Sequence, residues 1–398
     1  MNTEFLGANK IASLSFFMKL IMLGFVAYGL ILYFPVSSKS INNIFYLVVA
    51  VPGFIWAIRD RARLYRAIRH YLWFLLPLFM LVLAVSHELK DIKIFLYLVL
   101  FWLFLLMLEE RHILGVRLPM LGVSGANVVL LFTAIFSWAA TGLSTGIWGR
   151  SNLLLGYAVN PVYTATLMMM SMVFLWVFFL DEHLQARGKW IHVSGFVALL
   201  LLGMVCATVF QARSALVGFA LFVFLYVVFK RAYVLVFGAV LAGIGLLLVD
   251  GFREAVLARG LSYRPQIWED AMVRVVDVCG LWLGCGDDGY EFLGRWAHAH
   301  SAYVSIFYEA GLVGAALFLL FLGIIFFLAM KARSKWLLVA MVGWGSLITT
   351  TGGVFSTPHQ AFWMYFWFPT LMAAIEVQQS RAAGTTREGA HQVENAGA

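Results

Sequence analysis

The chain has 398 residues, of which 63% are hydrophobic and 12% are charged, and its formal net charge is +8. A soluble domain carries about 25% charged and 45–50% apolar residues, so this composition excludes a soluble enzyme, a disordered protein and a disulfide-stapled secreted domain. The positive balance does not indicate nucleic-acid binding, because basic residues in a membrane protein first report topology. The composition therefore predicts a polytopic membrane protein.

Apolar runs of roughly membrane-spanning length follow one another along the chain. About 20 helical residues cross the roughly 30 Å of hydrocarbon in a bilayer, and several runs here are shorter, which leaves the count open by one or two and leaves room for a re-entrant segment. Twelve runs are predicted to span the membrane: 11–34, 41–58, 71–86, 92–108, 120–140, 161–180, 191–210, 214–229, 233–249, 302–329, 337–351 and 361–377.

These runs divide the chain into four parts. Residues 1–249 hold the first nine predicted spans, 250–300 form a long external segment, and 301–377 hold the last three spans. Residues 378–398 are rich in Ala, Gly, Thr and Glu and are expected to form a disordered cytoplasmic tail. The predicted fold class is all-α, a polytopic bundle of about twelve transmembrane helices with a helical cap.

The distribution of basic residues predicts the orientation. Fourteen Lys and Arg residues occur in one alternate set of loops, whereas the short loops of the opposite set hold five. The positive-inside rule makes the first set cytoplasmic, which places both termini inside and the segment 250–300 outside. The first run lacks a small-residue cleavage site and is expected to be an uncleaved anchor. The loops of the first, basic set lie at 59–69, 111–117, 187–189, 230–231 and 331–335.

The three cysteines fall in two environments. Cys206 lies inside a predicted span and is expected to be a small packing residue. Cys279 and Cys285 both lie in the external segment, where an oxidising compartment permits a disulfide, and two free buried thiols are the alternative. Their spacing matches no zinc pattern.

The external segment 250–300 is too long for a simple connection and is expected to be ordered. Its residues 265–277 begin with Pro265, which suits the first turn of a helix, and residues 251–259 are a second candidate helix. Charged residues interrupt the apolar stripe, so the helix at 265–277 is expected to lie on the membrane surface or to cap the bundle. The predicted stripe consists of Trp268, Met272, Val275 and Val276.

The most specific pattern begins at the end of this segment. His300-Ser301 is followed after nine residues by Gly311-Leu312-Val313-Gly314. This pattern resembles the His-[Asn/Ser/Gln]-x9-Gly-x-x-Gly signature of the bacterial O-antigen ligases, and the span layout and the long external segment resemble that family as well. Weaker elements of the resemblance are Gln211-Ala212-Arg213-Ser214, Arg264-x3-Trp268-x2-Ala271, and Arg150 upstream of Asn160-Pro161-Val162-Tyr163.

The resemblance implies a fold, an activity and partners. The fold would be a GT-C-like glycosyltransferase architecture in the inner membrane of a Gram-negative bacterium, with the active site facing the periplasm. The activity would be an inverting, metal-independent transfer of O-antigen polysaccharide from undecaprenyl pyrophosphate to a sugar hydroxyl of lipid A-core. The expected partners are these two substrates and membrane lipids, with no nucleic acid, no cofactor and no metal.

The residue types suit this reaction independently of the family. A neutral histidine can accept the proton that the acceptor hydroxyl loses, which makes His300 the candidate general base. Arginine presents a planar fork of donors and stays charged, which suits a leaving pyrophosphate. Arg150, Arg213 and Arg264 lie on the external side of the predicted topology and are the candidate pyrophosphate ligands.

Each candidate also has a plainer interpretation. Arg213 at a span boundary could extend toward lipid phosphates, and Arg150 and Arg264 could be ordinary loop charges. His298 with His300 could suggest a metal pair, although no third ligand stands at diagnostic spacing. Gly311 and Gly314 are expected to permit close helix packing. Asp287 and Asp288 are expected to be turn residues.

Two other functions compete with the ligase. An O-antigen polymerase or another undecaprenyl-pyrophosphate-linked glycan transferase would share the donor and differ in the acceptor. A transporter would use its intramembrane charges as a substrate path, and transporters often show two related halves with broken helices at matching positions. The sequence shows no internal repeat, which favours the transferase.

Overall fold

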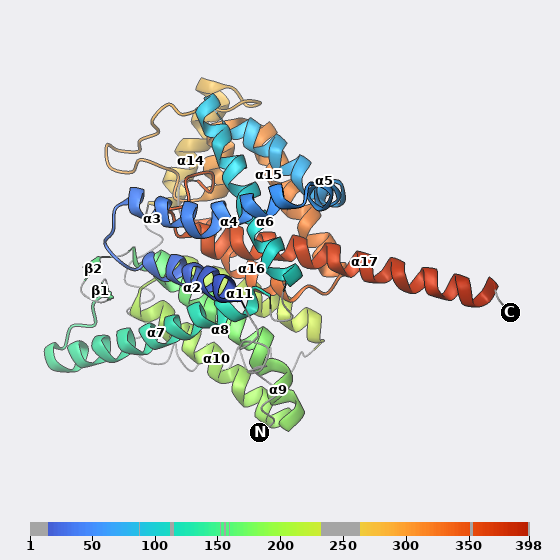
Figure 1. Ribbon diagram of the computed structural model, residues 1–398. Helices are drawn as coiled ribbons and strands as arrows, with labels where there is room; N and C mark the ends of the chain where they lie inside the picture. The colour runs from blue at the N-terminus through green and yellow to red at the C-terminus, as the bar shows by residue number, and fades with distance from the viewer. Residues whose placement is uncertain are drawn as a thin grey trace.

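The computed structural model describes residues 15–86, 88–111, 115–151, 153–154, 157–158, 160–231, 263–350 and 353–396 (Figure 1). The described chain is almost entirely helical, and its strands form one short antiparallel hairpin of β1 (Leu153–Leu154) and β2 (Tyr157–Ala158). Its α-helices are α2 Phe16–Ile31, α3 Ser38–Phe45, α4 Val51–Arg59, α5 Arg61–Val85, α6 Lys93–Arg111, α7 Arg117–Thr145, α8 Pro161–Leu175, α9 Asp181–Arg187, α10 Lys189–Val209, α11 Arg213–Lys230, α14 Arg264–Arg274, α15 Ala302–Lys331, α16 Lys335–Ser346 and α17 Phe368–Ala396.

Several helices continue through short turns of another pitch. Single π-helical turns occupy Tyr46–Ala50, Trp176–Leu180, Val275–Cys279 and Trp363–Trp367, and 3₁₀ turns occupy Leu89–Ile92 and Leu347–Thr349. The first two π turns join α3 to α4 and α8 to α9, so each pair forms one continuous helix.

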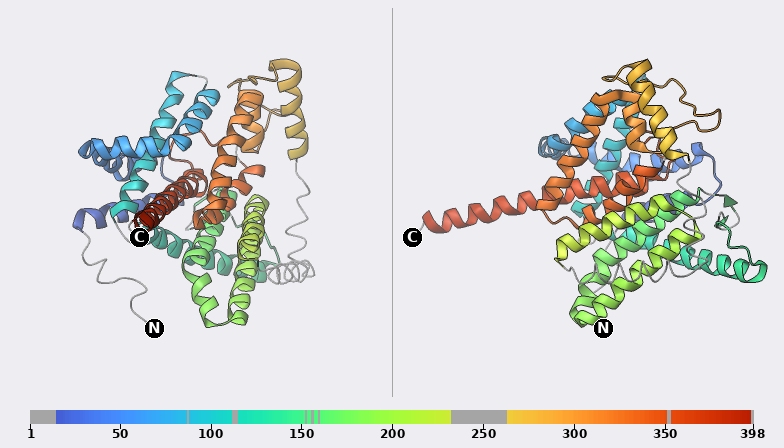
Figure 2. Two further views of the ribbon diagram at one scale, coloured as in Figure 1. Left: turned by 90° about the vertical axis from the view of Figure 1, so that its right-hand side faces the viewer. Right: turned by 180° about the vertical axis from the view of Figure 1, so that it is seen from behind.

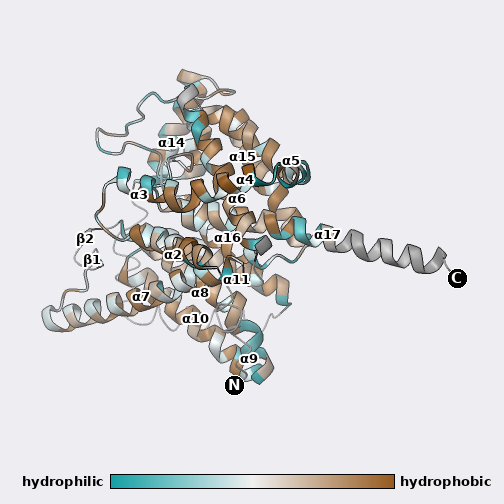
Figure 3. Ribbon diagram, viewed as in Figure 1, coloured by the Kyte–Doolittle hydropathy of each residue, from teal (hydrophilic) through white to brown (hydrophobic). Residues whose placement is uncertain are grey.

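The chain is a polytopic helical membrane protein. Seven helices in the described residues are long and apolar enough to cross a bilayer, and two shorter apolar helices accompany them. The predicted count of twelve is therefore not reached, and the run 233–249 lies outside the described residues. The other eleven runs each coincide with a helix, because twenty apolar residues in lipid must satisfy their backbone groups internally. Figure 3 shows hydrophobic residues along the bundle and hydrophilic ones gathered at α9, at α3 and at the start of α5.

The core lies around α16 and α17 in the middle of the bundle. Figures 1 and 2 show α5, α6, α14 and α15 on one side of these helices and α7 to α11 on the other. Trp363 to Trp367, at the entry to α17, are fully buried, as expected for a helix that is hydrophobic on all sides. Helices α11 and α16 pack closely along their length, and Gly218 and Gly345 permit their backbones to approach, since a Cβ on Gly218 would overlap the carbonyl of Val342.

Three of the basic turns of the chain meet at one end of the bundle. Lys230, which ends α11, pairs with Asp181 at 2.7 Å, and Lys335, which begins α16, pairs with Glu182 at 2.6 Å. Both acids begin α9, directly before the basic turn at 187–189. Three of the loops assigned to the basic set are therefore neighbours in space.

The segment from Gln378, expected to be a disordered tail, continues α17 as helix to Ala396, in keeping with the helix-forming Ala, Gln, Arg and Glu residues it contains. The candidate helix at 251–259 lies outside the described residues.

Candidate active site

The cap is built on α14, the predicted helix of the external segment. It begins at Arg264, with Pro265 in its first turn, and it packs on α15, so it caps the bundle as one of the two expectations had it. Its buried face is Ile267, Ala271 and Val275. The predicted stripe was wrong in part, because Trp268 is partly buried and Met272 and Val276 are exposed. The buried face follows i, i+4 and i+8 from Ile267, one position earlier than predicted.

The cap helix holds the turn that carries the candidate base. The indole Nε1 of Trp268 donates to the carbonyl of Ala299 at 2.9 Å, between His298 and His300. The backbone N–H of His300 donates to Nδ1 of His298 at 3.2 Å, and the two rings lie 4.1 Å apart. His300 adopts a left-handed φ of 51°, which ends the turn before the helix begins. Ser301 then caps α15, and its hydroxyl accepts from the N–H of Val304 at 3.3 Å.

The environment of His300 keeps the imidazole neutral. Burial, together with the nearby His298 and the positive charge of Arg264, lowers the pKa of His300 to about 4. Burial also lowers the pKa of His298. A neutral imidazole can accept a proton, whereas an imidazolium cannot. Arg264 and His300, which lie 36 residues apart in sequence, are therefore neighbours, with the cation beside the candidate base.

Arg150 and Arg213 flank a second turn, between α10 and α11. Arg150 donates through Nε to the carbonyl of Phe210 at 2.9 Å, and Ser151 donates its N–H to the carbonyl of Val209 at 2.8 Å. Arg213 is the first residue of α11 and is partly buried. The two arginines, which lie 63 residues apart, thus border the same turn.

The end of α16 connects these two groups. Tyr303, near the start of α15, donates its hydroxyl to the carbonyl of Trp344 at 3.1 Å. Ser214, beside Arg213, donates to the carbonyl of Thr349 at 3.1 Å. The structure thus brings His300 together with Arg264 and Arg150 together with Arg213, and it attaches both pairs to the segment 344–349.

α15 is interrupted at Gly311, ten residues after Ser301. Gly311 has φ 59° and ψ −156°, so the helix consists of the segments 302–310 and 312–331. The loop 280–286 fills the break: its Cys285 and Gly286 donate N–H groups to the carbonyls of Tyr308 and Glu309 at 2.7 and 3.0 Å. In return the carbonyls of this loop's residues 281 and 282 accept from the N–H groups of residues 312 and 313.

Gly311 therefore has a role different from the packing that the sequence suggested. A Cβ at Gly311 would lie 2.5 Å from the backbone carbonyl group of Trp282, and one at Gly284 would lie 2.5 Å from the backbone N of Gly311. The two glycines let the loop enter the helix break, where its backbone groups satisfy those that the break exposes. For Gly314, the neighbour that a Cβ would meet is Ala310, at 2.3 Å.

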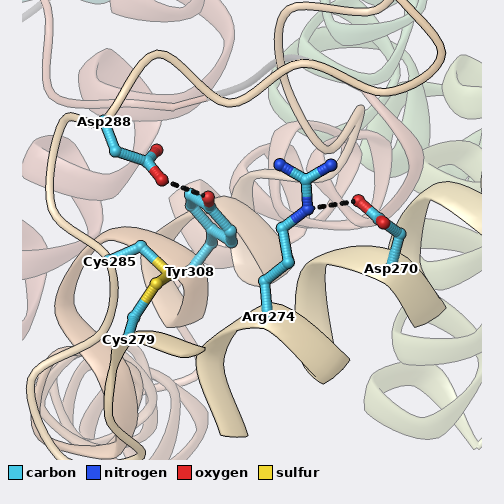
Figure 4. Close-up of a disulfide and its surroundings, with 6 residues drawn as sticks. All are labelled: Asp270, Arg274, Cys279, Cys285, Asp288 and Tyr308. Atoms are coloured by element: carbon cyan, nitrogen blue, oxygen red, sulfur yellow. Dashed lines mark hydrogen bonds and ion pairs between the residues drawn. A yellow bond between two sulfur atoms is a disulfide. The ribbon is translucent and has the colours of Figure 1, made fainter. Parts of the chain in front are cut away.

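A disulfide closes the loop that enters the break. Cys279 and Cys285 are bonded, which decides between the two alternatives left by the sequence, and Cys206 is free and buried as expected. Figure 4 shows this disulfide beside Tyr308, whose hydroxyl donates to Asp288 at 2.7 Å. In the described residues, the His, Cys, Asp and Glu ligand atoms that cluster within 4.8 Å belong to Cys279, Cys285 and Asp288. The disulfide takes both thiolates of that group, so the disulfide-bonded form does not fit a thiolate metal site.

Sequence reasoning missed the pocket next to this turn. A pocket of about 90 Å³ is lined by His298, Asp287, Asp288, Ser305 and Glu309. The aspartates had been expected to be simple turn residues. The available signal was the i, i+4 relation of Ser305 and Glu309 inside the histidine signature, between Ser301 and Gly311, which places both on one helix face.

Comparison with known proteins supports the family resemblance. No family model matches the chain. Over 272 residues the chain is 26% identical to a protein of Pseudomonas aeruginosa called O-antigen ligase. The chain resembles the O-antigen ligases. The match covers 64% of this chain and 62% of the relative, so less than two thirds of the relative's length is spanned.

Proposed function

We propose that this chain is an O-antigen ligase, a glycosyltransferase of lipopolysaccharide biosynthesis. The observation that carries the proposal is the turn at His300, where a neutral imidazole lies beside the cation of Arg264. The similarity to the ligase of P. aeruginosa supports the same conclusion. The donor is undecaprenyl-pyrophosphate-linked O-antigen, and the acceptor is a sugar hydroxyl of lipid A-core.

The reaction is a single displacement with inversion. The acceptor oxygen attacks the anomeric carbon of the donor sugar, and His300 takes the hydroxyl proton as the new C–O bond forms. The bond between the anomeric carbon and the pyrophosphate oxygen breaks at the same time. Undecaprenyl pyrophosphate leaves with the bonding electron pair, and Arg150, Arg213 and Arg264 stabilise its charge. No metal is required, because the arginines supply the positive charge.

We propose that the protein lies in the inner membrane with both termini in the cytoplasm. Three of the basic turns lie together at one end of the bundle, and by the positive-inside rule this end is cytoplasmic. The cap on α14 then faces the periplasm, where an oxidising environment maintains the disulfide between Cys279 and Cys285. We further propose a GT-C-like architecture with about twelve spans, in which the two shorter apolar helices and further apolar runs add to the seven full-length helices.

The proposal is tested with purified protein, undecaprenyl-pyrophosphate glycan and lipid A-core. His300→Ala should abolish transfer to the core, whereas His70→Ala, at an exposed histidine on α5, should retain it. Retained transfer in His300→Ala would remove this residue as the base. Glycan moving onto a second donor chain instead of the core would identify a polymerase.

The pyrophosphate role is tested by exchanging cations. Arg213→Lys keeps the charge but loses the bidentate fork, and we expect transfer to fall at least about tenfold. Arg187→Lys, at an exposed arginine of α9, is the control. Normal activity of Arg213→Lys would favour contact with lipid phosphates instead. Loss of activity in EDTA that a divalent ion restores would contradict metal independence.

A further inference from the structure

The pocket beside His298 differs in charge from the arginine-bearing turns. Its described lining includes the carboxyl groups of Asp287, Asp288 and Glu309, and no lysine or arginine. The negative charges of Asp287 and Asp288, which are adjacent in the chain, repel a phosphate or pyrophosphate group. The donor's leaving group therefore belongs with the arginines, and this pocket requires a ligand of another kind.

Ser305 gives an independent sign that the pocket is a binding site. Its side chain is 4% exposed, it lines the pocket, and its hydroxyl has no hydrogen-bond partner among the described residues. A buried hydroxyl left without a partner is costly, and such groups commonly mark the place of a ligand or water. Glu309 lies one helical turn later on the same face of α15. A ligand in the pocket would meet both side chains.

The lining matches a polyhydroxylated ligand. Carboxyl groups accept hydrogen bonds from hydroxyl groups, and a protonated carboxyl can also donate one, so this lining can pair with several hydroxyl groups of one ligand. Tyr290 and Tyr308 add aromatic rings 4.8 Å apart, which offer an apolar surface to the faces of a sugar ring. The hydroxyl of Tyr308 donates to Asp288 and thereby fixes that carboxylate at the rim. In the described residues the ligand atoms of Asp287, Asp288 and Glu309 do not form a cluster of metal-binding dimensions.

We propose that this pocket binds the sugar of the acceptor whose hydroxyl is glycosylated. This inference rests on the proposed ligase function and assigns the second substrate to its own subsite. Donor and acceptor are separated by charge: the arginines hold the anionic leaving group, and the carboxylates hold the hydroxyl-bearing acceptor. The two histidine rings, 4.1 Å apart, stand between the subsites, with His298 in the pocket and His300 beside Arg264.

His298 is a positioning residue in this arrangement. Its Nδ1 accepts the backbone N–H of His300, so a neutral His298 carries its proton on Nε2. That nitrogen can donate to an acceptor oxygen but cannot take a proton from it. His300 is left as the group that accepts the hydroxyl proton, and His298 orients the sugar toward it.

The test separates the acceptor from the donor. We expect Glu309→Gln to raise the KM for lipid A-core about tenfold and Ser305→Ala to raise it several-fold, with the KM for the donor unchanged. Asp277→Asn, at an exposed acid of the cap outside the lining, is the matched control. Delipidated core oligosaccharide, titrated by calorimetry against the purified protein, measures binding without transfer. Elution as a single species shows that each variant is folded, and Ser305→Ala removes a single oxygen.

The outcomes are distinguishable. If the wild type transfers glycan and both variants keep the wild-type KM for lipid A-core, the acceptor pocket is refuted while the ligase function stands. If the wild type fails to transfer but binds core oligosaccharide, and Glu309→Gln weakens that binding, the pocket stands and the ligase function fails. A wild type that neither transfers nor binds core oligosaccharide refutes both. A Mg²⁺ requirement that is lost in Glu309→Gln would assign the pocket to a cation and overturn the proposal.

Discussion

Gly311→Ala tests how the cap is joined to the bundle. The backbone at Gly311, with φ 59° and ψ −156°, lies in a region that glycine alone populates readily, and another residue there costs about 1–3 kcal/mol. The added Cβ would lie 2.5 Å from the carbonyl carbon and oxygen of Trp282. Backbone atoms cannot rotate away as a side chain can, so the loop 280–286 has to leave the helix break.

The magnitude follows from the bonds that hold this loop. Four backbone hydrogen bonds join it to the break. At about 0.5–1.5 kcal/mol each, their loss amounts to roughly 2–6 kcal/mol locally. A straightened α15 can form its own bonds in exchange, so we expect the free energy of global unfolding to fall by only about 1–3 kcal/mol. The amides of Cys285 and Gly286 gain no such replacement, and a local loss of about 2.8 kcal/mol speeds their exchange ~100-fold.

Hydrogen exchange read by mass spectrometry in detergent measures this effect directly. Peptides covering 280–286 should exchange faster in Gly311→Ala, while peptides of α11 and α16 should be unchanged. Gly323→Ala is the matched control in the same helix, because a Cβ there meets nothing within 4 Å. Unchanged protection of Cys285 and Gly286 in Gly311→Ala would refute the view that glycine is what admits the loop.

Three other features of the molecule carry predictions. Replacing Cys279 and Cys285 by Ser removes a link across a short loop and should cost about 2 kcal/mol, seen as a lower Tm that reducing agent no longer affects. Asp181→Asn leaves Lys230 without its anionic partner and should destabilise the protein by ~2–3 kcal/mol, and an unchanged Tm would show that this pair is dispensable. Transfer should persist well below pH 6.5 and fall only toward pH 4, because His300 stays neutral until it titrates, and a half-maximal rate near pH 6.5 would contradict this environment. Because burial lowers the pKa of His300 in the folded state, the contribution of His300 to stability is present above pH 6.5 and is lost on acidification toward pH 4.

Much of the bundle follows from the sequence because lipid leaves the chain few choices. A long apolar run must become a helix, and eleven of the twelve predicted runs coincide with one. The number of full membrane spans differs from the predicted twelve because the length of an apolar run does not determine whether its helix crosses the whole bilayer. The buried face of α14 was displaced by one residue because that short helix is amphipathic only in relation to what it packs on, and its partner α15 is far along the chain.

The candidate site could be predicted only where the residue type itself indicates a chemical role. His300 and Arg264 were identified from their types and motif, and the structure shows that they are neighbours. The residue types of Asp287 and Ser305 do not indicate a function, because a turn aspartate and a helical serine are common in any protein. Their significance comes from a pocket that forms only when the loop after the disulfide folds onto α15.

The spacing of the histidine-glycine signature has a physical basis in this fold. Ser301 is the N-cap of α15 and Gly311 is the break, so the nine residues between them are the short helical segment 302–310. An N-cap must accept from the backbone, which explains the small polar residue after the histidine. The break must admit another backbone, which explains the glycine. Each helical residue turns the helix by about 100°. Only a fixed number of residues between the N-cap Ser301 and the break at Gly311 therefore directs Ser305 and Glu309 into the pocket while the loop 280–286 occupies the break. The signature therefore sets the distance and the rotation along α15 between the candidate base His300 and the break at Gly311 that receives the loop 280–286, in addition to supplying the base itself.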